Sequence, residues 1–408
     1  MWLNNATVAS LPIKCSRHNT PSRSHSLYKL VKSCYAGGDE FVVVVCEKRD
    51  IFALTGAMAR TLPLFNAKST APSIGRTVTV EFLLVGEDNK PLSNSDLSCL
   101  EALAHGVRLT AKIVDMPCAD MHTDTFIEEV RAVGKDLGIV PRVIQGEECL
   151  DMGLGGIYNV GKAAEHAPAL CYLSHTPDGA QKTVAWVGKG IVFDTGGLCI
   201  KSKVGMCTMK TDCGGAAAML GAFYLAVKMR TCTSYSAWLR MLSGRKPSAL
   251  MISLHFTQES KYHAGLVANN EDWEQACVKA GQVSGDLVHP VPYSPELHFP
   301  EFSSTVADMK NSVADRGNAQ VSCAGLFIGS HLGFDFPGVW LHVDMAAPAH
   351  IGDRATGYGP ALLNILFGAK SSNPLLQGLA PPGVIWEREC MEVEDDVPSL
   401  KKVKLQPE

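Results

Sequence analysis

Two stretches of the sequence decide the fold class: Val187-Gly-Lys-Gly-Ile-Val-Phe-Asp-Thr-Gly-Gly-Leu-Cys-Ile-Lys201 and Met209-Lys-Thr-Asp-Cys-Gly-Gly-Ala216. In the first stretch an apolar run ends at Lys189, between two glycines, and a second short run ends at Asp194. Lys201 and Asp212 follow, the aspartate just before a segment rich in small residues. Open α/β sheets bind ligands beyond the carboxyl ends of their strands, where glycine lets the backbone approach closely. These stretches therefore predict four polar side chains at one edge of an α/β sheet.

The same four side chains have the chemistry of a metal site. Carboxylates are hard ligands that suit a divalent cation. An amine can join them only without its proton, and burial beside a cation lowers a lysine pKa enough to allow this. A lysine that keeps its charge can stabilise an oxyanion, and a metal supplies hydroxide at neutral pH. The pattern permits metal-assisted hydrolysis. The alternative, that Lys189 and Lys201 are surface charges and the aspartates are caps, stays open.

These motifs resemble the signature of the leucyl aminopeptidase family of dinuclear metallopeptidases. The resemblance runs from about Asn5 to Phe367. Three further motifs belong to it: Gly155-Gly-Ile-Tyr-Asn-Val-Gly-Lys162, Ala307-Asp-Met-Lys-Asn-Ser312 and Ala355-Thr-Gly-Tyr-Gly359. The resemblance implies that Lys189 and Asp212 bind the second metal of the pair. It also implies that Asp194 bridges both metals and that Lys201 is the catalytic lysine.

The resemblance and the composition together set the functional expectations. The family hydrolyses N-terminal residues from peptides, uses two zinc or manganese ions, and assembles into a homo-oligomer, a hexamer. The net charge of −4 and the pI of about 6.4 do not favour nucleic acid. No apolar run approaches the roughly 20 residues that cross a membrane. Met1–Cys15 does not look like a signal peptide, so we expect a cytoplasmic protein whose 14 cysteines are mostly reduced.

Residues 229–260 depart from the family pattern. Family members carry, after the helix that follows Asp212, an N-T-D-A-E-G-R motif. Its acidic residues complete both metal sites, and its arginine positions a bicarbonate as general base. Here the only acidic residue in the segment is Glu259. We therefore expect at most one tight metal site, formed by Lys189 and the two aspartates, and a chain nearly inactive on aminoacyl amides. The alternative to an active aminopeptidase is an impaired relative, either a binding or assembly subunit or a non-functional variant.

Strand-like and helix-like segments alternate along the chain and predict an α/β fold with two domains. Residues 1–108 should form a small N-terminal α/β domain with strands at Phe41–Cys46 and Thr77–Val85, and we expect some N-terminal structure to be missing. Residues 109–370 should form a larger catalytic α/β domain with a central mixed sheet, largely parallel. Residues 371–408 turn to Pro, Glu, Asp and Lys and should be a loose tail.

Further elements follow from hydrophobic periodicity. The expected strands are Ala169–Leu173, Thr183–Val187 and Val339–Val343. The expected helices are Ile51–Phe65, Gly214–Lys228 and Pro360–Phe367, together with one that has a capping box at Thr125 and a stop at Gly138. Ala249–Phe256 is apolar and partly alternating and should fill a vacated strand position, with Arg230–Pro247 as irregular loop. The alternative, a disordered stretch beside a damaged sheet, stays open. His342 and Asp344 are expected to be satisfied core groups.

Overall fold

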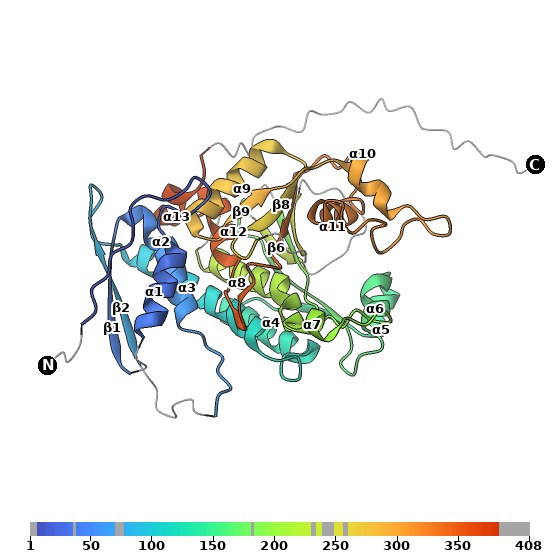
Figure 1. Cartoon of the computed structure of the whole chain (residues 1–408), viewed down its shortest axis with the longest axis horizontal. Helices are drawn as coiled ribbons and strands as arrows, with labels where there is room; N and C mark the ends of the chain where they lie inside the picture. Colours follow the sequence, from blue (N-terminus) through green and yellow to red (C-terminus); the bar gives the residue numbers. More distant parts are fainter. Residues whose placement is uncertain are drawn as a thin grey trace, which may run out of the picture.

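The computed structural model describes residues 6–35, 38–69, 77–180, 183–229, 234–238, 249–255 and 260–382. Its N-terminal part is a small α/β unit at one end of the molecule (Figure 1). Strands β1 (Glu40–Cys46) and β2 (Val78–Leu84) pair in parallel, and helices α1 (Ser24–Cys34) and α2 (Ile51–Thr61) pack against each other. Both predicted strands and the predicted helix are confirmed, although the helix ends four residues before Phe65.

The central sheet joins eight described strands in the order β3-β4-β6-β5-β7-β10-β8-β9. Their bounds are β3 (Arg142–Gln145), β4 (Ala169–His175), β5 (Thr183–Gly188), β6 (Ser234–Trp238), β7 (Ala249–His255), β8 (Ala264–Ala268), β9 (Val288–Pro290) and β10 (Trp340–Asp344). The four central strands, β6, β5, β7 and β10, run parallel, whereas β4 and β8 are antiparallel to the strands beside them in the centre. The sheet is therefore mixed with a parallel centre, as predicted.

Helices α8 (Gly214–Lys228) and α11 (Gln320–Gly329) cover opposite faces of this sheet. Successive side chains of a strand point to opposite faces. On β10, Leu341 belongs to the main core, which includes most of α8, whereas Trp340 belongs to a separate cluster with Val321 of α11. Because α8 is apolar and small-residue-rich all around, it lies buried between the sheet and the outer helices.

Helix α3 (Asn94–Asp115) connects the N-terminal unit to the catalytic part. Ser93 caps it, since its hydroxyl accepts a hydrogen bond from the Asp96 amide at 3.1 Å. The helix packs closely on α8, where a Cβ added to Gly106 would lie 2.7 Å from the carbonyl oxygen of Gly221. Our sequence analysis did not predict this helix, and the expected domain boundary falls inside it.

A buried ion pair fixes α2 to the catalytic part. Arg60 of α2 pairs with Asp286, and the two side chains are 9% and 0% exposed. Asp286 also accepts hydrogen bonds from the amides of Gly359 at 2.9 Å and Leu362 at 3.3 Å. These contacts neutralise and satisfy a carboxylate that would otherwise be costly to bury.

The two strands from residues 229–260, the anomalous segment, both join the sheet. β7 pairs in parallel with β5 and with β10, so the prediction of a strand over Ala249–Phe256 is confirmed for Ala249–His255. β6 lies between β4 and β5, so the prediction of irregular loop over Arg230–Pro247 is wrong for Ser234–Trp238. Aromatic residues in that run favour a strand, and the backbone groups of β5 need a partner on that side. The remainder of both segments lies outside the described residues.

The other described elements lie outside the eight-stranded sheet. They are α4 (Thr123–Leu137), α5 (Glu147–Asp151), α6 (Gly155–Gly161), α7 (Lys203–Met206), α9 (Glu271–Ser284), α10 (Pro295–His298), α12 (Pro360–Leu366), β11 (His350–Ile351), β12 (Arg354–Ala355) and four 3-10 helices, η1 (Lys48–Asp50), η2 (Met209–Cys213), η3 (Phe299–Phe302) and η4 (Gly368–Lys370). The predicted stop of α4 at Gly138, with φ of 70°, is confirmed. The predicted capping box at Thr125 is wrong, because His122 is the N-cap and its side chain makes no capping bond.

The start of the expected tail differs from the prediction. Helix α13 (Pro374–Leu379) buries Leu375 and Leu376 in the main core. Asn373 caps this helix, and its side-chain amide donates to the carbonyl of Ser95 in α3 at 3.0 Å. Two leucines thus hold the chain down where composition suggested a loose segment, and residues 383–408 lie outside the described part. None of the helices in the described part combines the length and apolar character needed to cross a bilayer.

Candidate active site

Gly188 positions the first pair of site residues. A Cβ added to Gly188 at the end of β5 would lie 2.6 Å from both the Cα of Ala216 and the carbonyl oxygen of Gly215. The strand end therefore packs directly on the first turn of α8, and the Ala216 amide donates to the carbonyl of Lys189 at 2.8 Å. Asp212 lies in η2, just before that turn. This packing brings Lys189 Nζ to 3.2 Å from Asp212 Oδ2.

A glycine-rich loop forms the second pair. The Gly196 amide donates to Asp194 Oδ1 at 2.9 Å, and the Lys201 amide donates to the carbonyl of Thr195 at 2.9 Å. Gly196 and Gly197 have φ of 85° and 65°, a left-handed conformation that other residues rarely adopt. The loop thus turns back on itself and places Lys201 Nζ 3.0 Å from Asp194 Oδ2.

The two aspartates differ in burial and in pKa. The side chain of Asp212 is 3% exposed and that of Asp194 is 35% exposed. Burial raises the pKa of Asp212, and the neighbouring Lys189 offsets only part of this effect. Burial also acts on Asp194, but the Gly196 amide and Lys201 together outweigh it and lower the pKa of that carboxyl. The carboxyl of Asp194 therefore loses its proton more readily than that of Asp212.

One oxygen of Asp212 is left without a hydrogen bond. Lys189 is close enough for an ion pair, but Asp212 Oδ2 has no well-directed donor among the described residues. The Lys189 ammonium offsets part of the cost of burying this carboxylate, and an ion bound by both aspartates would satisfy the oxygen directly. The donor set therefore fits a bound divalent cation.

The structure places all four predicted site residues in one cluster beyond the carboxyl end of β5. Lys189 and Lys201 each lie close enough to lower the pKa of both aspartates, and the charge of Asp194 in turn raises the pKa of Asp212. This is the arrangement that the two motifs predict, whereas the roles of the residues as ligands and catalytic lysine stay predictions.

Another donor group was missed by sequence reasoning. His122, Asp124 and His166 offer ligand atoms within 4.8 Å of one another. Asp124 and His166 are 42 residues apart, and no ligand spacing marks them in the sequence. His342 and Asp344, by contrast, are buried in β10 with 0% and 2% exposure, as expected of core groups.

Comparison with protein families matches most of the chain. The catalytic domain of the cytosol aminopeptidase family matches residues 108–243 and 255–364, and the M17 aminopeptidase N-terminal domain 2 matches residues 1–71. The probable aminopeptidase NPEPL1 of Homo sapiens is 49% identical, over 94% of this chain and 83% of the relative. That alignment spans 435 positions, more than the 408 residues of this chain, so the relative has residues without a counterpart here. The break in the family match, residues 244–254, falls within the anomalous segment.

Solved structures agree with the sequence comparison. The leucine aminopeptidase of Caenorhabditis elegans, LAP1, superposes with a TM-score of 0.83 at 35% identity, covering 90% of this chain and 84% of that one. The leucyl aminopeptidase of Trypanosoma brucei in complex with bestatin gives a TM-score of 0.78 at 33% identity, covering 86% and 78%. This chain therefore belongs to the M17 cytosol aminopeptidase family, a family of metal-dependent aminopeptidases.

Proposed function

We propose that this aminopeptidase hydrolyses N-terminal residues from peptides at the cluster beyond β5. Lys189, Asp194 and Asp212 would hold one divalent cation, and Lys201 would act on the substrate carbonyl. The observation that carries the proposal is the buried Asp212 Oδ2, which accepts no hydrogen bond from the described residues and lies 3.2 Å from Lys189 Nζ. Two carboxylates and an amine suit zinc or manganese better than they suit an ion such as Ca²⁺, which prefers oxygen ligands alone.

The residues of the chain divide the work. When bound, the cation supplies a hydroxide nucleophile at neutral pH and polarises the peptide carbonyl. Lys189, which now pairs with Asp212, would serve as a ligand of the cation only as a neutral amine. The Lys201 side chain is 28% exposed and pairs with Asp194, and its ammonium would stabilise the oxyanion that develops on the substrate carbonyl.

The proposal limits this cluster to one tight metal. The resemblance to the family implies a second ion held by acidic residues that residues 229–260 do not supply, and Asp194 alone would remain for it. A single ion with open positions for water would still activate water for hydrolysis, and we expect a lower rate because a cooperating catalytic group is lost. By the same family resemblance we propose peptide substrates, a cytoplasmic location and assembly into a homo-oligomer.

Turnover and inhibitor binding together test the proposal. The purified full chain is incubated with leucine amide in the presence of Zn²⁺ or Mn²⁺, and bestatin binding is measured by calorimetry. We expect slow, chelator-sensitive hydrolysis and metal-dependent bestatin binding, both lost in Asp212→Ala. Metal-dependent bestatin binding without any hydrolysis would instead favour the impaired relative. Hydrolysis that survives Asp212→Ala and Lys201→Ala would show that the site lies elsewhere.

A further inference from the structure

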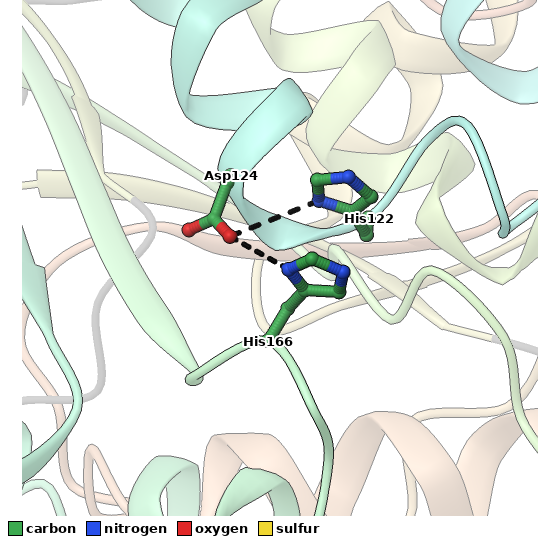
Figure 2. A group of neighbouring side chains, drawn as sticks. All are labelled: His122, Asp124 and His166. Atoms are coloured by element: carbon green, nitrogen blue, oxygen red, sulfur yellow. Dashed lines mark hydrogen bonds and ion pairs between the residues drawn. The ribbon is translucent and has the colours of Figure 1, made fainter.

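A group of two histidines and an aspartate lies apart from the four residues beyond β5. His122 is the N-cap of α4, and Asp124 lies in the first turn of that helix. His166 comes from the segment between α6 and β4, and the structure brings it against the start of α4. Figure 2 shows the carboxylate of Asp124 facing both imidazole rings. Two separate segments thus contribute ligand-type side chains to one point.

The nitrogen and oxygen atoms converge closely. His166 Nδ1 lies 2.7 Å and His122 Nδ1 lies 3.9 Å from the same oxygen, Asp124 Oδ2. The two rings stack with centroids 3.5 Å apart and planes 1° from parallel. A zinc ion about 2.0–2.1 Å from its ligand atoms keeps tetrahedral ligand atoms about 3.3 Å apart. The two observed separations bracket this value, and binding would require the rings to tilt out of their stacked arrangement until each ring plane contains the ion.

Neighbouring groups hold the ligands from behind. Gln145 Nε2 donates to the other carboxylate oxygen, Asp124 Oδ1, at 2.7 Å. Thr125 Oγ1 lies 3.3 Å from the second nitrogen of His122, Nε2. Such outer contacts orient metal ligands and set which ring nitrogen is free to bind. They leave Nδ1 of His122 and Oδ2 of Asp124 directed at the common point.

Hydrogen bonding alone does not account for the group. One histidine, His166, satisfies Asp124 Oδ2, yet His122 Nδ1 is buried and makes no hydrogen bond among the described residues. An unsatisfied buried nitrogen costs free energy, because it has lost its hydrogen bonds to water. A cation bound to the ring nitrogens and to the carboxylate would satisfy it.

We infer that His122, Asp124 and His166 form a separate metal site that takes a zinc-like transition-metal ion. Imidazole ligands suit Zn²⁺, Cu²⁺ or Ni²⁺ and disfavour Mg²⁺ and Ca²⁺, which require oxygen ligands. The side chains are 25%, 48% and 36% exposed, so water completes the coordination. The inference does not depend on the proposed aminopeptidase site.

The site would tie α4 to the segment before β4. Phe126, one helical turn after His122, lies 3.8 Å from the point where a Cβ on Gly190 would stand. Gly190 directly follows Lys189, so the same helix supports the loop of the active site. A metal bound at this site therefore stabilises the folded chain by mass action and restrains the helix beside that loop.

Zinc titration of matched variants tests the inference. The full chain is treated with iodoacetamide so that exposed thiols such as Cys118 do not compete, stripped with chelator, and titrated with Zn²⁺ by calorimetry. In the double variant His122→Ala/His166→Ala, we expect the affinity of one of the bound zinc equivalents to weaken at least roughly 100-fold, so that this equivalent is lost from the titration. Asp212→Ala should keep this equivalent. The exposed His331→Ala serves as the matched control and should behave as wild type.

Spectroscopy separates imidazole ligation from other binding. With Co²⁺ in place of Zn²⁺, visible bands of a low-symmetry site should persist in Asp212→Ala and disappear in the double histidine variant. Asp124→Asn, which keeps the size of the side chain, provides a second variant. Circular dichroism checks that this variant is folded. Equal stoichiometry and affinity in wild type and in both triad variants would overturn the inference.

Discussion

The two donor groups of this molecule are built by different means. Backbone packing places Lys189 and Asp212, because Gly188 lets β5 touch the first turn of α8. Side-chain contacts place His122, Asp124 and His166, which come from a helix cap and a connecting segment. The first group is carboxylate and amine and reaches 3% exposure at Asp212, whereas the second is imidazole-rich and partly exposed.

The difference shows how each kind of site responds to substitution. A site that depends on backbone approach fails when a glycine gains a side chain, even if every ligand remains. A site that depends on side-chain hydrogen bonds fails when one ligand or its supporting group is removed, while the fold persists. Substitutions that separate packing from ligation therefore test both assignments.

The largest effect is expected at Lys201. In Lys201→Ala the hydrolysis rate of leucine amide should fall about 10²–10³-fold, as when an oxyanion-stabilising group is lost. The value of kcat should fall more than KM rises, because the interaction forms mainly in the transition state. Lys201→Arg keeps the charge and should retain part of the rate. An unchanged kcat in the alanine variant would remove Lys201 from the mechanism.

The next effect is on metal affinity at the first group. Asp212→Asn removes the buried negative charge while keeping the shape, so Zn²⁺ should bind that group at least roughly 100-fold more weakly. The histidine group should keep its equivalent in the same calorimetric titration. Loss of both equivalents would mean that the two groups are not independent and would contradict the comparison.

The first group could be predicted from the sequence because its backbone packing requires glycines at recognisable positions. Backbone approach requires glycine, and the glycines around Lys189, Asp194 and Asp212 stand in the two opening stretches. The strand and helix that carry them, β5 and α8, also follow from apolar periodicity. The sheet order could not be read in this way, because the pairing of β6 between β4 and β5 is a long-range contact.

The second group could not be predicted because side-chain convergence has no sequence signature here. The spacing of His122 and Asp124 matches neither a helix face nor a ligand motif, and His166 joins them only through the packing of α4 beside β4. Helix α3 was missed for a related reason. It lies across the domain boundary expected at residue 108, so its residues were divided between two units.

His25 belongs to neither donor group and gives a test that depends on pH. Burial, aided by the charge of Arg60, lowers the pKa of His25 to about 4. The folded chain thus binds fewer protons than the unfolded chain between pH 6.5 and 4, so the free energy of unfolding falls as the pH falls through that window. The loss should be on the order of 3 kcal/mol. Urea unfolding of wild type and His25→Asn, measured at several pH values between 6.5 and 4, isolates the contribution of His25. If the free energy of unfolding fell with pH equally in both proteins, the prediction would be contradicted.

The smallest effect tests the packing of the first group directly. In Gly188→Ala the new Cβ would lie 2.6 Å from the Cα of Ala216, so the strand and helix must separate at a cost of about 1–3 kcal/mol. Gly56→Ala is the matched control, because Gly56 lies in α2 with no atom within 4 Å of an added Cβ, and it should stabilise the fold by about 0.5–1 kcal/mol. Urea unfolding measures both changes in stability.

Zinc titration of the same variants then shows whether metal affinity depends on this packing. Gly188→Ala should weaken binding at the first group, although all of its ligands remain, and leave the histidine group unchanged. Equal weakening at both groups would mean that the substitution loosens the whole sheet, and unchanged binding at both would mean that the contact at Gly188 does not position Lys189 and Asp212.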